Sequence, residues 1–97
     1  MNAIYVAALT QPDAERVLAI LMNESNLQLV SYGAHAVDLQ LPDAPSPHAV
    51  NLEASYAAGT LRLAFHMDEA TAQQQREWLL KRAQALGVQL MLSLVPD

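Results

Sequence analysis

The sequence predicts an α+β fold, a two-layer sandwich of ferredoxin-like type in which two helices cover one face of an antiparallel sheet. Residues 50–67 alternate apolar and polar side chains on both sides of Ala58-Gly59, which is typical of a β-hairpin with one face in water. A helical pattern and a last alternating segment follow this hairpin, while an apolar run and another helical pattern precede it. The predicted order is therefore β-α-β-β-α-β, with one or two additional antiparallel strands.

The first quarter of the chain predicts a strand followed by a helix. Residues 2–9 form a short apolar run that is typical of a buried strand. Thr10 can then cap a helix whose first turn accommodates Pro12, and the helical pattern continues to about residue 24. Most of its apolar side chains share one stripe, but Ile20 points well away from that stripe.

The next segment, residues 26–41, is predicted to be extended, but its alternation changes phase in the middle. A hairpin that turns near Gly33 would explain the change, and so would one long strand with a bulge there. The sequence leaves both alternatives open. Residues 42–48 contain three prolines and predict a loop, because proline disrupts a helix and cannot donate to a ladder.

The last third of the chain predicts a helix and a strand. Asp68 can cap this helix, and Gly87 can end it. Trp78 lies about 120° from the centre of the buried stripe of the helix, on the same flank as Arg82. Residues 88–95 alternate apolar and polar side chains, which predicts the final strand.

The first and last strands predict an apolar surface on the side of the sheet away from the helices. We expect Ile4, Val6 and Ala8 to face the helices. The opposite face would then carry a set of apolar side chains too large to leave in water, which consists of Tyr5, Leu9, Ala64, Met91 and Val95. Either the extra strands of residues 27–41 or a second copy of the chain would cover this set. A homodimer joined by sheet faces or by an exposed edge strand is therefore expected.

Length and composition indicate a single domain, residues 1–97, without disulfides. The chain has 97 residues, of which 53% are hydrophobic and none is cysteine, so disulfides, thiolate metal sites and a cysteine nucleophile are excluded. No apolar run is long enough to span a bilayer, and the first residues lack the basic segment of a secretory signal. We therefore expect a soluble cytoplasmic protein.

The net charge of −5 arises within the first 61 residues. Arg16 is the only base there, and the acids are Asp13, Glu15, Glu24, Asp38, Asp43 and Glu53. Phosphate binding needs clustered Lys and Arg, so the sequence argues against nucleic acid and against an anionic membrane as direct partners. An acidic DNA mimic that occupies a nucleic-acid-binding protein is one alternative that this charge leaves open.

The sequence contains no specific pattern for catalysis or for cofactor binding. Its three glycines cannot form a glycine-rich phosphate cradle, and no two histidines have the helical spacing of a metal site. His66 is predicted to face Asn51 across the hairpin, with Glu53 on the diagonal. Such a pair could act as a general base, or it could be an ordinary polar pair on a wet sheet face. No cofactor is predicted.

The sequence favours a non-catalytic protein that associates with other proteins, as an adaptor, an inhibitor, an immunity-like protein or a regulatory subunit. Trp78, Ile20 and Arg82 are the predicted partner-binding residues, because Trp contributes strongly at interfaces and both helix flanks carry apolar residues outside the buried stripes. The two helices lie side by side in such a sandwich, however, so Ile20 and Trp78 could instead pack on each other.

The alternative function is that of a small-molecule-binding protein or an enzyme of the dimeric α+β barrel type. Its pocket would lie on the open sheet face and would be lined by Tyr5, Tyr32, His66 and Glu53. This alternative rests on an analogy between folds, and such folds host many unrelated functions.

Overall fold

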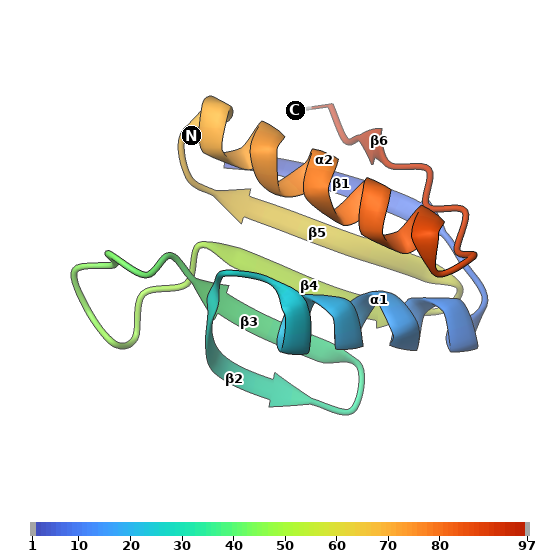
Figure 1. The fold of residues 1–97 in the computed structure, drawn as a ribbon, viewed down its shortest axis with the longest axis horizontal. Helices are drawn as coiled ribbons and strands as arrows, with labels where there is room; N and C mark the ends of the chain where they lie inside the picture. The colour runs from blue at the N-terminus through green and yellow to red at the C-terminus, as the bar shows by residue number, and fades with distance from the viewer. Residues whose placement is uncertain (1, 97) are drawn as a thin grey trace.

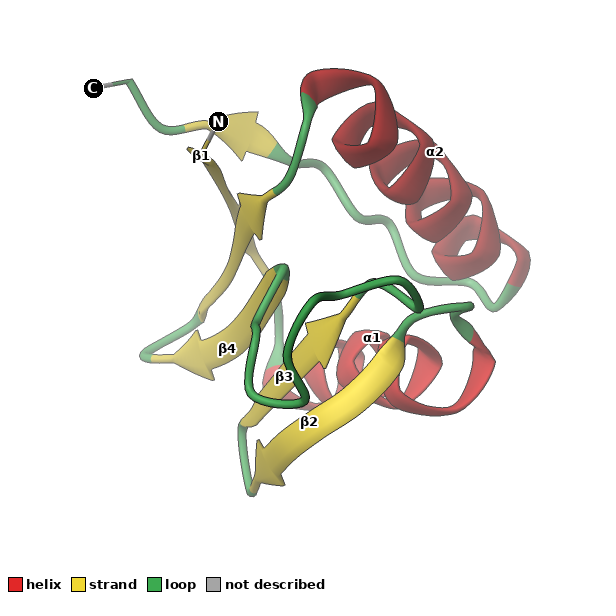
Figure 2. Ribbon diagram, turned by 90° about the vertical axis from the view of Figure 1, so that its left-hand side faces the viewer, coloured by secondary structure: helices red, strands yellow, loops and turns green. Residues whose placement is uncertain are grey.

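The computed structural model describes residues 2–96 and consists of two layers, a sheet and a pair of helices (Figure 1). In chain order the elements are β1 (Asn2–Ala8), α1 (Gln11–Glu24), β2 (Gln28–Gly33), β3 (Ala36–Gln40), β4 (Leu52–Ala57), β5 (Thr60–His66), α2 (Glu69–Ala85) and β6 (Ser93–Leu94). Both helices lie on one face of the sheet, as the turned view in Figure 2 shows. The α+β sandwich predicted from the sequence is therefore confirmed.

The sheet has six strands in the order β2-β3-β4-β5-β1-β6, and every neighbouring pair is antiparallel. This order differs from that of a four-stranded ferredoxin-like sheet, so the finer part of the fold prediction is not confirmed. The difference arises because a hairpin, β2 and β3, follows α1 and extends the sheet beyond β4. The two edge strands are consequently β2 and β6.

Both helices begin at the caps that the sequence predicts. The side chain of Thr10 accepts a hydrogen bond from the backbone N–H of Asp13, and the side chain of Asp68 accepts one from that of Thr71. The chain leaves α2 through Gly87, whose positive φ of 82° suits glycine. Neither of these two described helices is long and apolar enough to cross a membrane.

Residues 26–41 form a hairpin, and they also contain a bulge at another place. β2 and β3 are joined by a two-residue turn that follows Gly33, which is the hairpin alternative. The register between the two strands shifts between Leu29 and Ser31, so Val30 is the extra residue of a β-bulge. The change of phase in the sequence therefore has two causes, three residues apart.

The strand β1 has the opposite phase to the predicted one. Tyr5 faces the helices, because it pairs with Leu63 of the core and packs against the core itself. Ile4, Val6 and Ala8 accordingly lie on the far face of the sheet. The prediction was wrong because β1 is apolar at nearly every position, so its pattern does not show which face is buried.

The final strand is much shorter than the predicted segment, residues 88–95. In the described chain, only Ser93 and Leu94 pair with β1. The chain leaves α2 in the helix layer and must cross to the sheet layer before it can pair. Val88 and Leu90 are buried in the core during this crossing, with 1% and 8% of their surface exposed. Burial between the layers, rather than strand pairing, explains their alternation with polar residues.

The core lies between the layers and is mainly aliphatic. Its largest fully buried side chains are Phe65, Ile20, Leu21, Leu39, Leu52, Leu61, Leu63, Leu79, Val17, Val37 and Val88. Ile20 belongs to this set, with 2% of its surface exposed, so the buried stripe of α1 is wider than the helical pattern predicts.

Candidate functional site

Exposed apolar side chains mark the two edges of the sheet. Within residues 2–96, the large hydrophobic side chains that remain exposed are Leu29, Tyr32, Met91, Leu94 and Val95. The first two belong to β2, and the other three lie in β6 or within two residues of it. Because β2 and β6 are the outermost strands, both groups lie where a sheet can accept another strand.

The β6 edge is poorly suited to accept a strand. Its ladder with β1 contains two residue pairs, Tyr5 with Leu94 and Val6 with Ser93, and Pro96 follows shortly after. A very short edge strand and a nearby proline both hinder pairing with another chain. This edge is therefore blunted, which means that it is protected against the addition of another strand.

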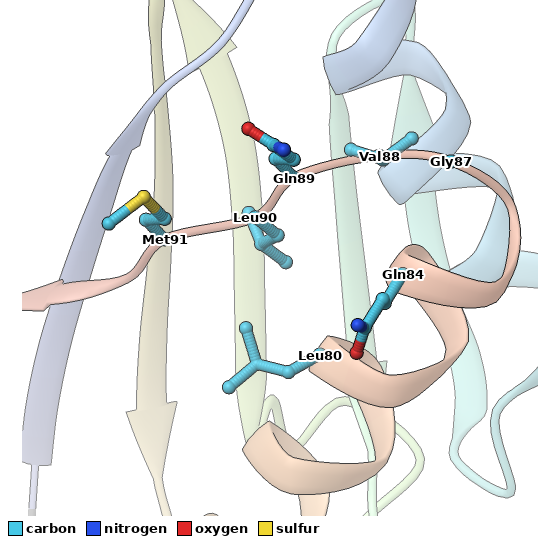
Figure 3. Close-up of a pocket in the computed structure, with 7 residues that line it drawn as sticks. All are labelled: Leu80, Gln84, Gly87, Val88, Gln89, Leu90 and Met91. Atoms are coloured by element: carbon cyan, nitrogen blue, oxygen red, sulfur yellow. The ribbon is translucent and has the colours of Figure 1, made fainter.

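The segment before β6 also stands away from β1. It lines two open hollows, one of about 590 Å³ beside α2 and one of about 550 Å³ beside β1, and Gln89 and Met91 line both. Figure 3 shows the first hollow, where the segment from Gly87 to Met91 passes Leu80 of α2. Another strand could therefore not form a continuous ladder of backbone hydrogen bonds along this part of the edge.

The β2 edge has the opposite character. Its six residues include no charged residue and no proline, and β3 occupies only one side of the strand. Leu29 is 44% exposed and Tyr32 is 69% exposed. Sheet edges are commonly protected by charge, proline, shortness or a bulge, and β2 has only the bulge at Val30. Of the two edges, β2 is therefore the one that can add a strand.

A small hollow of about 140 Å³ lies beside this edge, between α1 and the turn of the β2–β3 hairpin. Leu18 and Met22 of α1 are among its lining residues. Val37 of β3 lines it as well and is the ladder partner of Tyr32. The exposed apolar side chains of β2 thus lie near a hollow that apolar side chains on the flank of α1 also line.

The sheet face away from the helices carries a solvated polar pair. His66 Nε2 lies 3.4 Å from Oε2 of Glu53, and both side chains are partly exposed. Asp38 lies opposite Glu53 in the ladder and accepts a hydrogen bond from Ser31. Within residues 2–96, no three His, Cys, Asp or Glu side chains form a group that could hold a metal ion. The face offers hydrogen-bonding groups to water or to a partner.

The proline loop folds against one end of this face. The two N–H groups of Gln40 Nε2 are shared among the backbone carbonyl oxygens of Ser46, Pro47 and Ala49, at distances of 3.2, 3.2 and 3.0 Å. The residue is only 8% exposed and is the buried polar residue of the described chain. One carboxamide therefore fixes the position of the loop.

The three predicted partner-binding residues lie in different environments. Ile20 is in the core, so a partner cannot reach it in the folded chain. Trp78 is half-buried against the core and lines a hollow of about 340 Å³ together with Glu24. Arg82 donates through Nε to Oε1 of the same Glu24, which joins α2 to α1. Trp78 and Arg82 therefore share a surface at the junction of the helices, and Ile20 does not belong to it.

The four residues predicted to line a pocket do not meet. His66 and Glu53 pair on the open face, whereas Tyr5 lies on the helix side with its ring edge-to-face with Phe65, at 5.8 Å between ring centroids. Tyr32 lies on β2, which three strands separate from β1. The β2 edge was not predicted as the site, because a sequence pattern does not show which strand is outermost. The absence of charge from residues 28–33 was the available signal.

The fold and the site define an α+β protein with one sheet edge open to strand addition. Comparisons with protein-family models, with curated proteins and with solved structures find no match for this chain.

Proposed function

We propose that this chain is a non-catalytic association protein that forms a homodimer through the outer edge of β2. The observation that carries the proposal is an uncharged, six-residue edge strand with Leu29 and Tyr32 exposed on it. Strand addition would pair backbone N–H and C=O groups that water otherwise solvates, and it would cover both apolar side chains at the same time.

The charge of the molecule supports a second copy as the partner at this edge. Two molecules of net charge −5 repel each other, and the repulsion is smallest where they meet through uncharged residues. The strand β2 contains none of the ten acidic residues. An edge strand can also pair with its own copy, because an antiparallel pair has a two-fold axis.

The surroundings of His66 support association over catalysis. The side chains of His66 and Glu53 are 33% and 47% exposed, whereas ligand and enzyme sites usually hold such groups in a largely enclosed, apolar cavity. The pair fits a solvated polar sheet face better than an acid–base site. We place the protein in the cytoplasm, since a chain without cysteine does not depend on an oxidising compartment.

We also interpret β4, β5, β1 and β6 as a ferredoxin-like unit. These four strands are consecutive neighbours in the sheet, and with α1 and α2 they follow the order β-α-β-β-α-β along the chain. The hairpin of β2 and β3 is then an addition to this unit. In this interpretation, the addition supplies the edge through which the protein associates.

Analytical ultracentrifugation over a range of concentrations tests the homodimer. We expect a reversible equilibrium with a Kd of roughly micromolar size, because two edge strands bury less than the ~1,600 Å² of a standard interface. Tyr32→Lys should give a monomer, because lysine on an edge strand blocks pairing. Leu94→Lys is the matched control, since Leu94 is 58% exposed at the other edge, and it should leave the dimer intact.

Circular dichroism of both variants verifies that they are folded. A wild-type chain that stays monomeric at several hundred micromolar, roughly a hundredfold above the expected Kd, overturns the proposal. A dimer that Leu94→Lys disrupts and Tyr32→Lys preserves would place the contact at β6 and would overturn it as well.

A further inference from the structure

The bulge in β2 places its two exposed apolar side chains on the same face of the sheet. Leu29 pairs with Leu39, and Tyr32 pairs with Val37, so the two β3 partners are two residues apart. Residues two apart on a strand share a face, and therefore Leu29 and Tyr32 share one although they are three apart. The extra residue, Val30, makes this possible.

The backbone groups of Leu29 and Tyr32 also point the same way. In an antiparallel ladder, each residue directs its N–H and C=O to one side, and the side alternates along the strand. The carbonyl of Leu39 accepts a bond of 2.8 Å from the N–H of Asn51 on the β4 side, so Leu29 opposite it directs its groups away from β3. Val37 lies two residues before Leu39 and therefore also directs its backbone groups toward β4. Tyr32, opposite Val37, accordingly directs its groups away from β3 as well.

We propose that two copies pair their β2 strands antiparallel about a two-fold axis that passes between Val30 and Ser31. Leu29 of each copy then lies opposite Tyr32 of the other copy, and both apolar pairs lie on the helix side of the joined sheet. Both residues of each pair present outward backbone groups, so they can exchange two hydrogen bonds. This inference rests on the proposed function and adds the register of its contact.

The two-fold register also limits the assembly to two chains. It occupies both open β2 edges at once, and the edges that remain outermost are the two blunted β6 edges. A head-to-tail contact between β2 and β6 would instead build an open filament. The pairing of Leu29 with Tyr32 is therefore specific for a closed dimer.

Engineered cysteines test this register, because the natural chain contains no cysteine. We expect an equimolar mixture of Leu29→Cys and Tyr32→Cys chains to form disulfide-linked dimers under mild oxidation as the main product. Opposed residues of an antiparallel pair have Cα atoms about 4.5–5.5 Å apart, within the range that a disulfide spans. Each variant alone should cross-link at least tenfold less, because its two cysteines lie beyond the ~7 Å limit. A mixture of Leu29→Cys with Leu94→Cys is the control for random collision.

The possible outcomes distinguish an error in the proposed register from the absence of a dimer. Cross-linking of Tyr32→Cys alone, or of Leu29→Cys alone, at the level of the mixture would show another register and would overturn this inference while the homodimer stands. Absence of cross-linking from every mixture, with a dimer present in ultracentrifugation, would overturn it too. A monomeric wild-type chain would overturn the proposed function together with it.

Discussion

The guanidinium of Arg76 lies over the ring of Tyr5, with its central carbon 4.6 Å from the ring centroid. This contact joins α2 to β1 and holds Tyr5 on the helix side of the sheet. Arg76 Nη2 also lies 3.6 Å from Oε1 of Glu69, whereas Nη1 is buried without a hydrogen-bond partner among the described residues. The arginine is thus well packed but incompletely satisfied.

We expect Arg76→Met to change the free energy of unfolding by less than about 1 kcal/mol, because methionine keeps the packing and removes an unpaired buried donor. Arg76→Ala should cost about 1–3 kcal/mol, since it removes the contact with Tyr5 and leaves a void. Urea denaturation of both variants measures the difference. Equal losses in the two variants would show that the charge, and not the packing, is what stabilises this contact.

Gln40 is expected to control the proline loop. Gln40→Leu keeps most of the side-chain volume but removes the donor of the Pro47 and Ala49 carbonyl oxygens, while the Ser46 oxygen keeps its bond from the N–H of Ala49, so it should cost about 1–3 kcal/mol. Amide hydrogen exchange in residues 42–51 should accelerate. Gln74→Leu, on the exposed face of α2, is the control and should stay within about 0.5 kcal/mol of the wild type. Unchanged exchange in the loop would contradict the role of Gln40.

Asp68 is expected to make the stability of α2 depend on pH. The hydroxyl of Thr71 donates to its carboxylate at 2.7 Å, and this bond is the main reason that the pKa of Asp68 is lowered, followed by the bond from the backbone N–H of Thr71. A lowered pKa in the folded state stabilises the fold above the ordinary aspartate pKa, and the gain is lost as the pH falls through the lowered value.

Asp68→Asn should therefore unfold at a lower urea concentration than the wild type at pH 7, and the difference should become smaller at about pH 3, which is below the ordinary pKa of an aspartate. Asp68→Ala should be less stable than Asp68→Asn at both pH values, because alanine cannot cap the helix. A difference between wild type and Asp68→Asn that is independent of pH would contradict this origin.

The parts of the fold that were predicted from the sequence are those that local chemistry decides. The hairpin of β4 and β5 has a regular alternation with small residues at its turn, and the helix caps at Thr10 and Asp68 are local signals. Each of these features depends on residues within a few positions of one another. The sequence therefore contains all the information needed to place them.

The parts that were not predicted depend on contacts between distant segments. The phase of β1 follows from Arg76 and Phe65, which lie far along the chain from Tyr5. To predict the burial of Ile20, one would need to know the width of the gap between the helices. To predict the exposure of Tyr32, one would need to know the strand order. The His66–Glu53 pair was predicted because both residues belong to one hairpin.

The antiparallel pairing of β1 with β6 has a practical consequence for experiments on this protein. The described chain starts in β1 and ends just after β6, so both ends leave the molecule at the same side of the sheet, as Figures 1 and 2 show. The strand β2 lies at the other side. A fluorescent domain or an affinity tag fused to either end would point away from β2, and in a dimer two such labels would stand at opposite ends of a twelve-stranded sheet.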